Sequence, residues 1–231
     1  MSRRKLLTVA SVTTVVAALV ALAAVHVSAN DTPDPQPLPE AREEMRMPLE
    51  KALSTRRSVR RYTDEPLTAK HIAALCWAAQ GITEPQRGYR TAPSAGALYP
   101  LELYVVRPEG VARYIPERNA LQPHASGDVR SRLSAAALNQ PWVRNAPAVF
   151  VFAGVFDRTQ GKYGERGRRY VWMEAGHAAQ NLLLAATAMD LAAVPVGAFR
   201  DEQVAGILTL PEDHRPLYIL PVGHPSDDHD M

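Results

Sequence analysis

Residues 174–182 have the sequence Glu174-Ala175-Gly176-His177-Ala178-Ala179-Gln180-Asn181-Leu182, and they lie within the longest helix that the sequence predicts, from about Arg168 to Met189. Small and apolar residues recur there at helical spacing, at Ala178, Leu182, Ala185 and Ala186. Because so many of them are alanines, this helix can pack closely against a neighbour, as helices do at a subunit interface. The stretch therefore predicts a long central helix with a close partner.

Strands and shorter helices are expected on both sides of this helix. Thr68 is expected to cap a helix that ends at Gly81, and a further helix is expected from Gly127 to Asn139. The β-prone segments are Leu101–Val106, a hairpin of Val111–Tyr114 and Asn119–Gln122, Ala148–Phe152, Ala193–Val196 and Leu217–Val222. Because helices and strands interleave irregularly, the sequence predicts an α+β sandwich rather than a doubly wound fold.

The composition of the chain limits the classes of protein to which it can belong. The chain has 231 residues, of which 46% are hydrophobic and 22% charged, and these values fit one globular domain. Three of its 26 basic residues lie at positions 3–5, so the rest of the chain has 23 basic residues against 24 acidic ones. A nearly neutral body argues against nucleic-acid binding by bulk charge. The single cysteine, Cys76, excludes an intramolecular disulfide and a multi-cysteine metal site, and its place on an apolar helix face predicts a core residue.

The first 29 residues predict an export or anchoring segment. Behind Arg3, Arg4 and Lys5 runs an uncharged stretch over residues 6–25, and small residues at 27–29 offer a signal-peptidase site. The arginine pair resembles the twin-arginine export signal, although an ordinary secretory signal also begins with basic residues. Residues 6–25 are also long enough to remain in a bilayer as an anchor of about 30 Å. We expect an exported, periplasmic or otherwise extracytoplasmic protein, with cleavage and membrane attachment left open.

A proline-rich linker is expected between this segment and the domain. Prolines at positions 33, 35, 37 and 39 favour an extended spacer over residues 30–44. The domain is then expected to span residues 45–225, followed by a flexible tail over 226–231. We interpret the histidines and aspartates of that tail as a frayed terminus rather than a metal site, and we predict no metal site elsewhere.

Four arginines and a hydroxyl lie close together near the start of the domain, in Arg56-Arg57-Ser58-Val59-Arg60-Arg61. Guanidinium groups form strong, charge-assisted hydrogen bonds with phosphate. A guanidinium beside the pyrimidine edge of a flavin also favours the anionic reduced ring. A solvated basic turn after a helix is the simpler interpretation of the same residues.

Two further segments offer backbone that a flat ligand can approach. Thr91–Pro100 is a loop of small residues between prolines, and small residues allow close contact with a ring. Pro195–Phe199 lies at the end of a predicted strand, where exposed backbone N–H groups can donate hydrogen bonds. Each segment alone is equally well a plain turn.

In their order and spacing, these segments resemble the nitroreductase superfamily, and specifically its SagB-type branch, whose members include azoline oxidases of thiazole and oxazole peptide biosynthesis. The resemblance covers Leu49 to Pro225. The stretches that carry it are 56–62, 93–100, 174–182, 196–199 and 220–223. The second and third of these are the most specific.

The resemblance implies a mainly antiparallel sheet flanked by helices, and a homodimer with two FMN sites at the subunit interface. Hydride then passes through flavin N5 between a donor such as NAD(P)H and a small or peptide-borne acceptor, and no side chain acts as a catalytic nucleophile. The FMN-binding residues so implied are Arg56, Arg57, Ser58 and Arg60, then Pro93, Ser94, Ala95 and Gly96 of the partner subunit, and Val196, Gly197 and Ala198 on the N5 side.

One departure from the family pattern concerns the phosphate. Many relatives place a lysine or arginine on it after the last strand, whereas this chain ends His224-Pro225-Ser226-Asp227-Asp228-His229-Asp230-Met231. That tail has no permanent cation. The phosphate is therefore expected to depend more on Arg56 and Arg57, or partly on His224, and flavin affinity is expected to be modest.

A rival function and two local alternatives remain. Because NAD(P)H is scarce outside the cytoplasm, the alternative to an oxidoreductase is an exported, noncatalytic flavin-binding or flavin-sequestering protein on the same fold. We interpret His177 as a hydrogen-bonded core histidine rather than an acid or base. The glycine-rich stretch Gly161–Arg169 is interpreted as a mobile lid or as interface packing. The sequence has no Walker loop and no GxGxxG motif, so a nicotinamide donor would bind transiently against the flavin.

Overall fold

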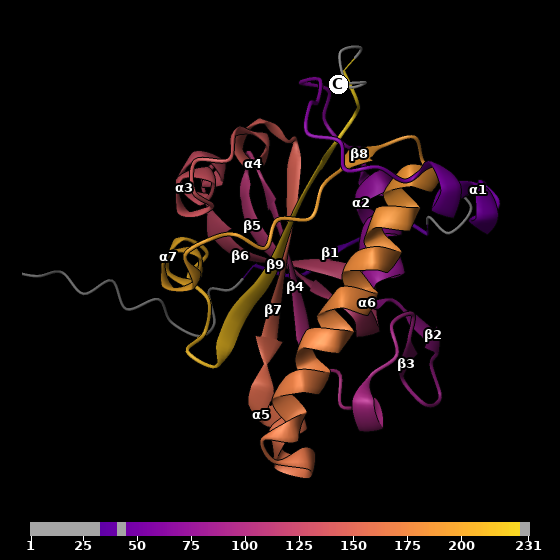
Figure 1. Ribbon diagram of the computed structural model, residues 1–231, viewed down its shortest axis with the longest axis vertical. Coiled ribbons are helices and arrows are strands. Elements are labelled where there is room, and N and C mark those ends of the chain that lie inside the picture. The colour runs from indigo at the N-terminus through magenta and orange to yellow at the C-terminus, as the bar shows by residue number, and fades with distance from the viewer. Residues whose placement is uncertain (1–32, 41–44, 227–231) are drawn as a thin grey trace, which may run out of the picture. The chain divides into compact units, whose positions relative to one another are not determined.

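A seven-stranded antiparallel sheet organises the part of the chain that the computed structural model describes, residues 33–40 and 45–226. The strand order is β1-β6-β5-β4-β7-β9-β8 (Figure 1). The strands are β1 (Gln36–Pro37), β4 (Leu101–Arg107), β5 (Gly110–Ile115), β6 (Ala120–Ser126), β7 (Ala148–Val155), β8 (Ala192–Ala193) and β9 (His214–Gly223). A separate short hairpin consists of β2 (Ile82–Glu84) and β3 (Tyr89–Arg90).

The central strand β7 shows why the sheet has two apolar faces. All its residues are buried, and successive side chains point to opposite faces, as the pleat of a strand requires. Phe150 and Phe152 pack into one core cluster with α2 (Ala69–Gln80) and α6 (Arg166–Ala188). Val149 and Val151 pack into another with α3 (Arg130–Ala136), α4 (Pro141–Asn145) and α7 (Asp201–Ile207). Helices therefore cover both faces, which confirms the predicted fold class.

Two short helices lie at opposite ends of α6. The helix α1 (Leu49–Thr55) packs beside its C-terminal residues, near Ala185 and Ala188 (Figure 1). The helix α5 (Phe156–Tyr163) precedes α6 and lies against its first turn, where Gly167 closely approaches the backbone of Thr159 and Gln160. The long helix therefore separates two different local environments.

Several local predictions are confirmed. Thr68 caps α2: its hydroxyl accepts from the His71 N–H at 3.1 Å, and the helix ends at Gly81. Cys76 is fully buried. The hairpin of β5 and β6 turns through the 3₁₀ helix η3 (Pro116–Arg118), as the proline at 116 suggested.

Other predictions differ from the structure. Gly161–Arg169 is helical rather than a lid, since α5 and α6 are joined only by a tight turn at Gly164, which has φ +55°. The strand expected at 193–196 is reduced to β8, because Pro195 has no N–H to continue the ladder and pairing resumes only as a bridge at Val196.

The proline-rich segment belongs to the folded unit and is no free linker. Gln36 and Pro37 pair with Leu121 and Ala120 of β6, and Leu38 exchanges backbone and side-chain hydrogen bonds with Asn119. Edge strands tolerate proline, because its missing N–H faces solvent. The domain boundary expected near Met45 therefore lies before Pro33.

The structure describes only part of the two ends of the chain for which the sequence made predictions. Ser226, assigned to the tail, still donates its N–H to the Arg61 carbonyl at 3.3 Å. The predicted export segment 1–29 and the last tail residues 227–231 lie outside the described residues. Within the described ranges, no helix combines the length and the apolar character that crossing a membrane needs.

Candidate functional site

The arginine segment is fixed to the end of the sheet by its backbone. Val59 donates its N–H to the Ala193 carbonyl at 3.0 Å, and Thr63 donates to the His224 carbonyl at 2.9 Å. Between them, the Tyr62 hydroxyl donates to the carbonyls of Val59 and Pro221 at 3.2 and 3.3 Å. Residues 56–63 therefore run along β8 and the end of β9 in a defined position.

Three of the arginines of this segment, Arg56, Arg57 and Arg60, have no acidic partner among the described residues. Arg57 donates only to backbone carbonyls, those of Ser54 and Arg56, at 3.1 and 2.8 Å. Arg57, Ser58 and Arg60 are exposed. Three adjacent cations without counter-charges form a site suited to an anion such as a phosphate.

The glycine–alanine corner lies beyond β8. Val196 exchanges both backbone hydrogen bonds with Ile219 of β9, at 2.8 and 3.1 Å. The chain then leaves the ladder, and Gly197 and Ala198 are exposed. Because Gly197 has no side chain, the backbone of this corner is open to a flat ligand.

The start of α4 connects the corner with the arginines. The Gln140 side-chain amide donates to the Ala198 carbonyl at 2.9 Å, and the Arg60 guanidinium lies over the Trp142 ring, 5.3 Å from its centre. The indole N–H of Trp142 is buried and has no hydrogen-bond partner in the described part of the chain. The structure thus brings Arg60 and the Gly197–Ala198 corner to one place, next to Gln140 and Trp142.

The loop from Pro93 to Pro100 lies elsewhere. It contains the 3₁₀ helix η2 (Ala95–Ala97) and packs against α5, since a Cβ at Gly96 would lie 2.9 Å from the Tyr163 hydroxyl and 3.0 Å from the Lys162 ammonium nitrogen. Its Ser94 side chain lies close enough to the Glu174 carboxyl group of α6 to affect the pKa of that group. The loop is therefore attached to the N-terminal half of α6.

The two groups meet α6 at different positions. The loop lies near Glu174, whereas α1, which leads into the arginine segment, packs beside Ala188. At about 1.5 Å per helical residue, these positions on α6 are separated by roughly 20 Å along the helix axis. The resemblance implies that a site using both groups takes them from two chains.

One long face of α6 is exposed. Trp172 and Met173 have 52% and 55% of their surface exposed, and Gly176, His177 and Gln180 continue the same stripe. His177 is therefore no core histidine, because the helix turns it to the outer face. The adjacent exposed apolar side chains of Trp172 and Met173 indicate a binding surface at this end of the stripe.

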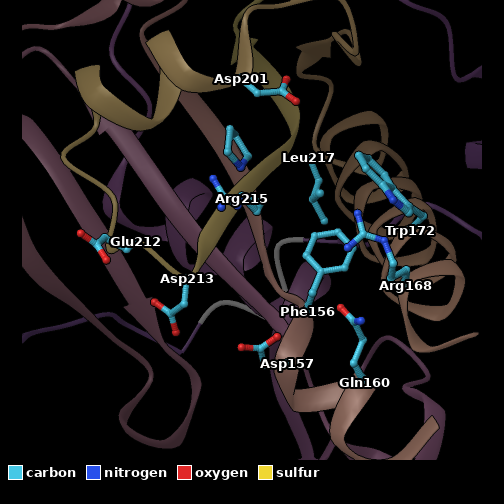
Figure 2. A pocket seen from close by; sticks show the side chains of 11 residues that line it. Phe156, Asp157, Gln160, Arg168, Trp172, Asp201, Glu212, Asp213, Arg215 and Leu217 are labelled. Carbon is cyan, nitrogen blue, oxygen red and sulfur yellow. The ribbon is translucent and has the colours of Figure 1, made fainter. Parts of the chain in front are cut away.

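A cavity of about 670 Å³ opens between α5, α6, α7 and the start of β9 (Figure 2). Phe156 and Trp172 meet edge to face in it, with ring centres 6.1 Å apart. Acidic residues outnumber basic residues in its lining. The acidic ones are Asp157, Asp201, Glu212 and Asp213, and the basic ones are Arg168 and Arg215. The cavity therefore combines an aromatic wall with an acidic rim.

His224 lies beside the arginine segment, since its carbonyl accepts from the Thr63 N–H at 2.9 Å. Its ring lies edge-on to His71, with centres 5.4 Å apart, and its Nε2 is 3.8 Å from a Glu65 carboxylate oxygen. Among the described residues, no cluster of histidine, cysteine and acidic groups suits a metal ion.

Glu174 is the titratable residue of this region that the sequence did not single out. It is 2% exposed, and burial raises the pKa of its carboxyl group from 4.5 to about 7, although the Ser94 side chain and the charge of Arg90 lower it. No sequence signal distinguishes it from an ordinary helix glutamate, because its burial depends on tertiary packing.

Comparison with known proteins identifies a common family. Residues 53–224 match the Nitroreductase family. A protein of Methanocaldococcus jannaschii named as a nitroreductase is 46% identical over 181 residues, which cover 76% of this chain and 90% of that protein. FMN reductase (NADPH) of Bacillus subtilis is 28% identical over 185 residues, covering 74% of this chain and 63% of that protein. The crystal structure of a protein from Ralstonia eutropha, described as a nitroreductase, has a TM-score of 0.75 and 30% identity, and the match covers 84% of this chain and 96% of that one.

Proposed function

Because the chain belongs to the nitroreductase family, we propose that it is an FMN-dependent oxidoreductase. The observation that carries the proposal is that Arg60, which forms no ion pair with a described carboxylate, and the Gly197–Ala198 corner meet at the start of α4. An anion site beside open backbone fits a ligand with a phosphate at one end and a flat ring at the other. The name of the Bacillus subtilis relative, FMN reductase (NADPH), supports this cofactor.

The residues of the site have separable roles in this proposal. Arg56 and Arg57 hold the phosphate, while Ser58 and Arg60 bind the ribityl chain and the pyrimidine edge. The exposed backbone at Gly197 and Ala198 faces N5, and the Trp142 indole offers a further donor. FMN, when bound, supplies a reversible hydride acceptor. A cation near the pyrimidine edge stabilises negative charge there, which favours acceptance of hydride.

The proposed active unit is a homodimer. The two halves of the site contact α6 at different positions, and the exposed stripe of this helix begins at Trp172 and Met173. A two-fold axis across this stripe would bring the loop of one chain toward the arginines of the other. Sedimentation or light scattering should give twice the chain mass of 25.3 kDa, and a monomeric protein that still binds FMN would contradict the shared site.

The acceptor is proposed to be small or borne on a peptide, in line with the SagB-type motifs. The cavity of Figure 2 offers it a place, because α7, which lines that cavity through Asp201, begins shortly after Ala198. Its acidic rim favours acceptors with a positive charge. Asp201→Asn should raise KM for a cationic acceptor and leave KM for a neutral quinone unchanged; equal effects on both would remove the rim from recognition.

The proposed location is outside the cytoplasm, with the export segment 1–29 acting before the domain reaches its site of action. N-terminal sequencing of the protein from fractionated cells distinguishes the outcomes. A start near residue 30 in the soluble extracytoplasmic fraction indicates cleavage, and an intact start in the membrane fraction indicates an anchor. An intact chain in the cytoplasm would contradict export.

Reduction of bound flavin is the direct test of the activity. The full-length protein, saturated with FMN, should lose its flavin absorbance on addition of NAD(P)H or a quinol and regain it with an electron acceptor. The rival, a flavin-sequestering protein, would bind FMN without this cycle. Protein that does not retain FMN at micromolar concentrations would contradict both functions.

A further inference from the structure

Another cavity, of about 270 Å³, lies where two neighbouring strands of the sheet separate. The pairing of β4 with β5 ends at Tyr104 and Arg113. Beyond that pair, residues 101–103 of β4 pair with β7, and residues 114–115 of β5 pair with β6. Both of these segments line the cavity. Because backbone N–H and C=O groups need hydrogen-bond partners, a gap between two strands favours a polar ligand over an apolar one.

A buried side-chain amide lines this cavity. Gln80, the last residue of α2, is 1% exposed, and its Oε1 accepts from the Arg90 guanidinium at 2.9 Å. Since a guanidinium can only donate, this contact fixes which end of the amide is the oxygen. The Nε2 group is buried and has no hydrogen-bond partner among the described residues. An unpaired buried donor is unfavourable, so this amide favours a ligand that accepts hydrogen bonds.

Three guanidinium groups from different elements line the same cavity. They belong to Arg90 of β3, Arg113 of β5 and Arg158 of α5. Glu102 accepts from Arg113 at 3.3 Å and from Arg158 at 2.6 Å, and Glu117 pairs with Arg90 at 3.2 Å. Three arginines and two glutamates leave the lining with one net positive charge. Each guanidinium has five N–H donors, which is more than these contacts use.

Two of these arginines are held in place by Tyr99, which lies outside the cavity lining. The Arg90 guanidinium lies over the Tyr99 ring, 4.6 Å from its centre, and Arg158 donates to the Tyr99 carbonyl at 3.1 Å. The side chain of Arg90 is 12% exposed, so water competes less for it than for a surface arginine. Side chains that are already fixed lose little freedom on binding, which favours affinity.

We propose that this cavity is a binding site for a small organic carboxylate, whose oxygens accept hydrogen bonds from the Gln80 amide and the surrounding guanidinium groups. A single negative charge matches the net charge of the lining, whereas Glu102 and Glu117 would repel a dianion. The volume lies below the usual range of drug-sized sites, which limits the ligand to a small molecule. The inference is independent of the proposed function, since none of the residues proposed to bind FMN lines this cavity.

Acetate is the probe for this site, and the side-chain amide signal of Gln80 in ¹H–¹⁵N NMR spectra is the local readout. In the full-length protein, sodium acetate added in exchange for sodium chloride at constant ionic strength should shift this signal saturably, with a dissociation constant in the millimolar range or below. The spectrum of Gln80→Leu identifies the signal by its loss. A Gln80 response to acetate no larger than the response to chloride would overturn the proposal.

Two arginine variants test whether position or general charge is responsible. Arg113→Gln should weaken acetate binding about tenfold or more, because it removes a charged donor and the net positive charge of the lining. The Arg113 side chain is 36% exposed, so this variant keeps the test available if Gln80→Leu does not fold. Arg118→Gln is the matched control, since Arg118 is an exposed arginine of η3 that does not line the cavity. Equal losses in the two variants would contradict a defined site.

Sulfate separates a carboxylate site from a general anion site. It is a dianion, so at equal ionic strength it should shift the Gln80 signal less than acetate does. Tighter binding of sulfate than of acetate would contradict the carboxylate class.

Arg57→Ala separates this site from the proposed FMN site, because it removes a cation there and none from this cavity. The Gln80 response to acetate should be unchanged in this variant. Loss of the response would show that the signal reports binding at the arginine segment and would overturn the separate site, whereas failure to bind FMN would contradict the proposed function alone.

Discussion

The two ends of α6 hold their functional groups by different means. At the C-terminal end, the arginines and the Gly197–Ala198 corner are carried by backbone hydrogen bonds to β8 and β9, such as Val59 to Ala193. At the N-terminal end, the strained Pro93–Pro100 loop is held by side chains, through the contacts of Tyr99 with Arg90 and Arg158. Backbone hydrogen bonds survive the replacement of a nearby side chain, whereas contacts that side chains make do not. We therefore call the first the constant end, where we propose that FMN binds, and the second the adjustable end.

The largest expected effect comes from removing the cations of the constant end. Arg56→Ala combined with Arg57→Ala should weaken FMN binding at least about 100-fold, since each charge-assisted hydrogen bond to a phosphate is worth about 1.5 to 3 kcal/mol. The melting temperature without flavin should stay unchanged, because neither guanidinium pairs with a described carboxylate. Fluorescence titration with FMN measures the affinity. Arg132→Ala, an exposed arginine of α3, is the control, and an equal loss there would show that general charge, not position, matters.

The next effect concerns the adjustable end and the free energy of unfolding. The raised pKa of Glu174 stabilises the fold fully below pH 4.5, and this contribution is lost as the pH rises to about 7. Between pH 5 and pH 8 the native chain should lose about 2 to 3 kcal/mol relative to Glu174→Gln. Urea unfolding at the two pH values gives both free energies. An equal change in the free energy of unfolding between the two pH values in both proteins would show that the carboxyl group is not the source of the pH dependence.

A smaller expected effect, on protein stability, distinguishes backbone strain in the loop from the contacts of the loop with α5. Gly96 and Gly88 have nearly the same φ, +65° and +67°, but a Cβ at Gly96 meets Tyr163 and Lys162, whereas one at Gly88 meets nothing within 4 Å. Gly96→Ala should therefore destabilise the protein by about 2 kcal/mol and Gly88→Ala by about 1 kcal/mol. Thermal unfolding compares them. Equal losses would mean that the flexible ends of Tyr163 and Lys162 move aside and that the loop is not tightly packed on α5.

The smallest effect tests whether α4 takes part in the constant end. The buried Trp142 indole N–H has no partner in the described part of the chain, so a bound cofactor is a candidate acceptor. Trp142→Phe should then weaken FMN binding by up to about tenfold, the value of one neutral hydrogen bond. Affinities and melting temperatures measured on the same samples distinguish a lost bond from lost packing. Unchanged affinity would place the acceptor elsewhere.

Sequence patterns predicted the elements well where the local signal was strong. The Thr68 cap and its helix, the hairpin around Pro116, the buried Cys76 and the extent of α6 all follow from residues close in the chain. The wrong predictions depended on distant partners. The proline-rich segment became an edge strand because β6 offered it hydrogen bonds, and His177 became exposed because the core lies on the other side of α6.

The sequence alone determined which chemistry is available: guanidinium groups for an anion, small residues for a flat ring, and a long alanine-rich helix for close packing. Only the tertiary structure decided how these groups are distributed, because it sets where each of them meets α6: α1 near Ala185 and Ala188, and the Pro93–Pro100 loop near Glu174. It also decided the state of Glu174, since a carboxyl group acquires a raised pKa only when folding removes it from water.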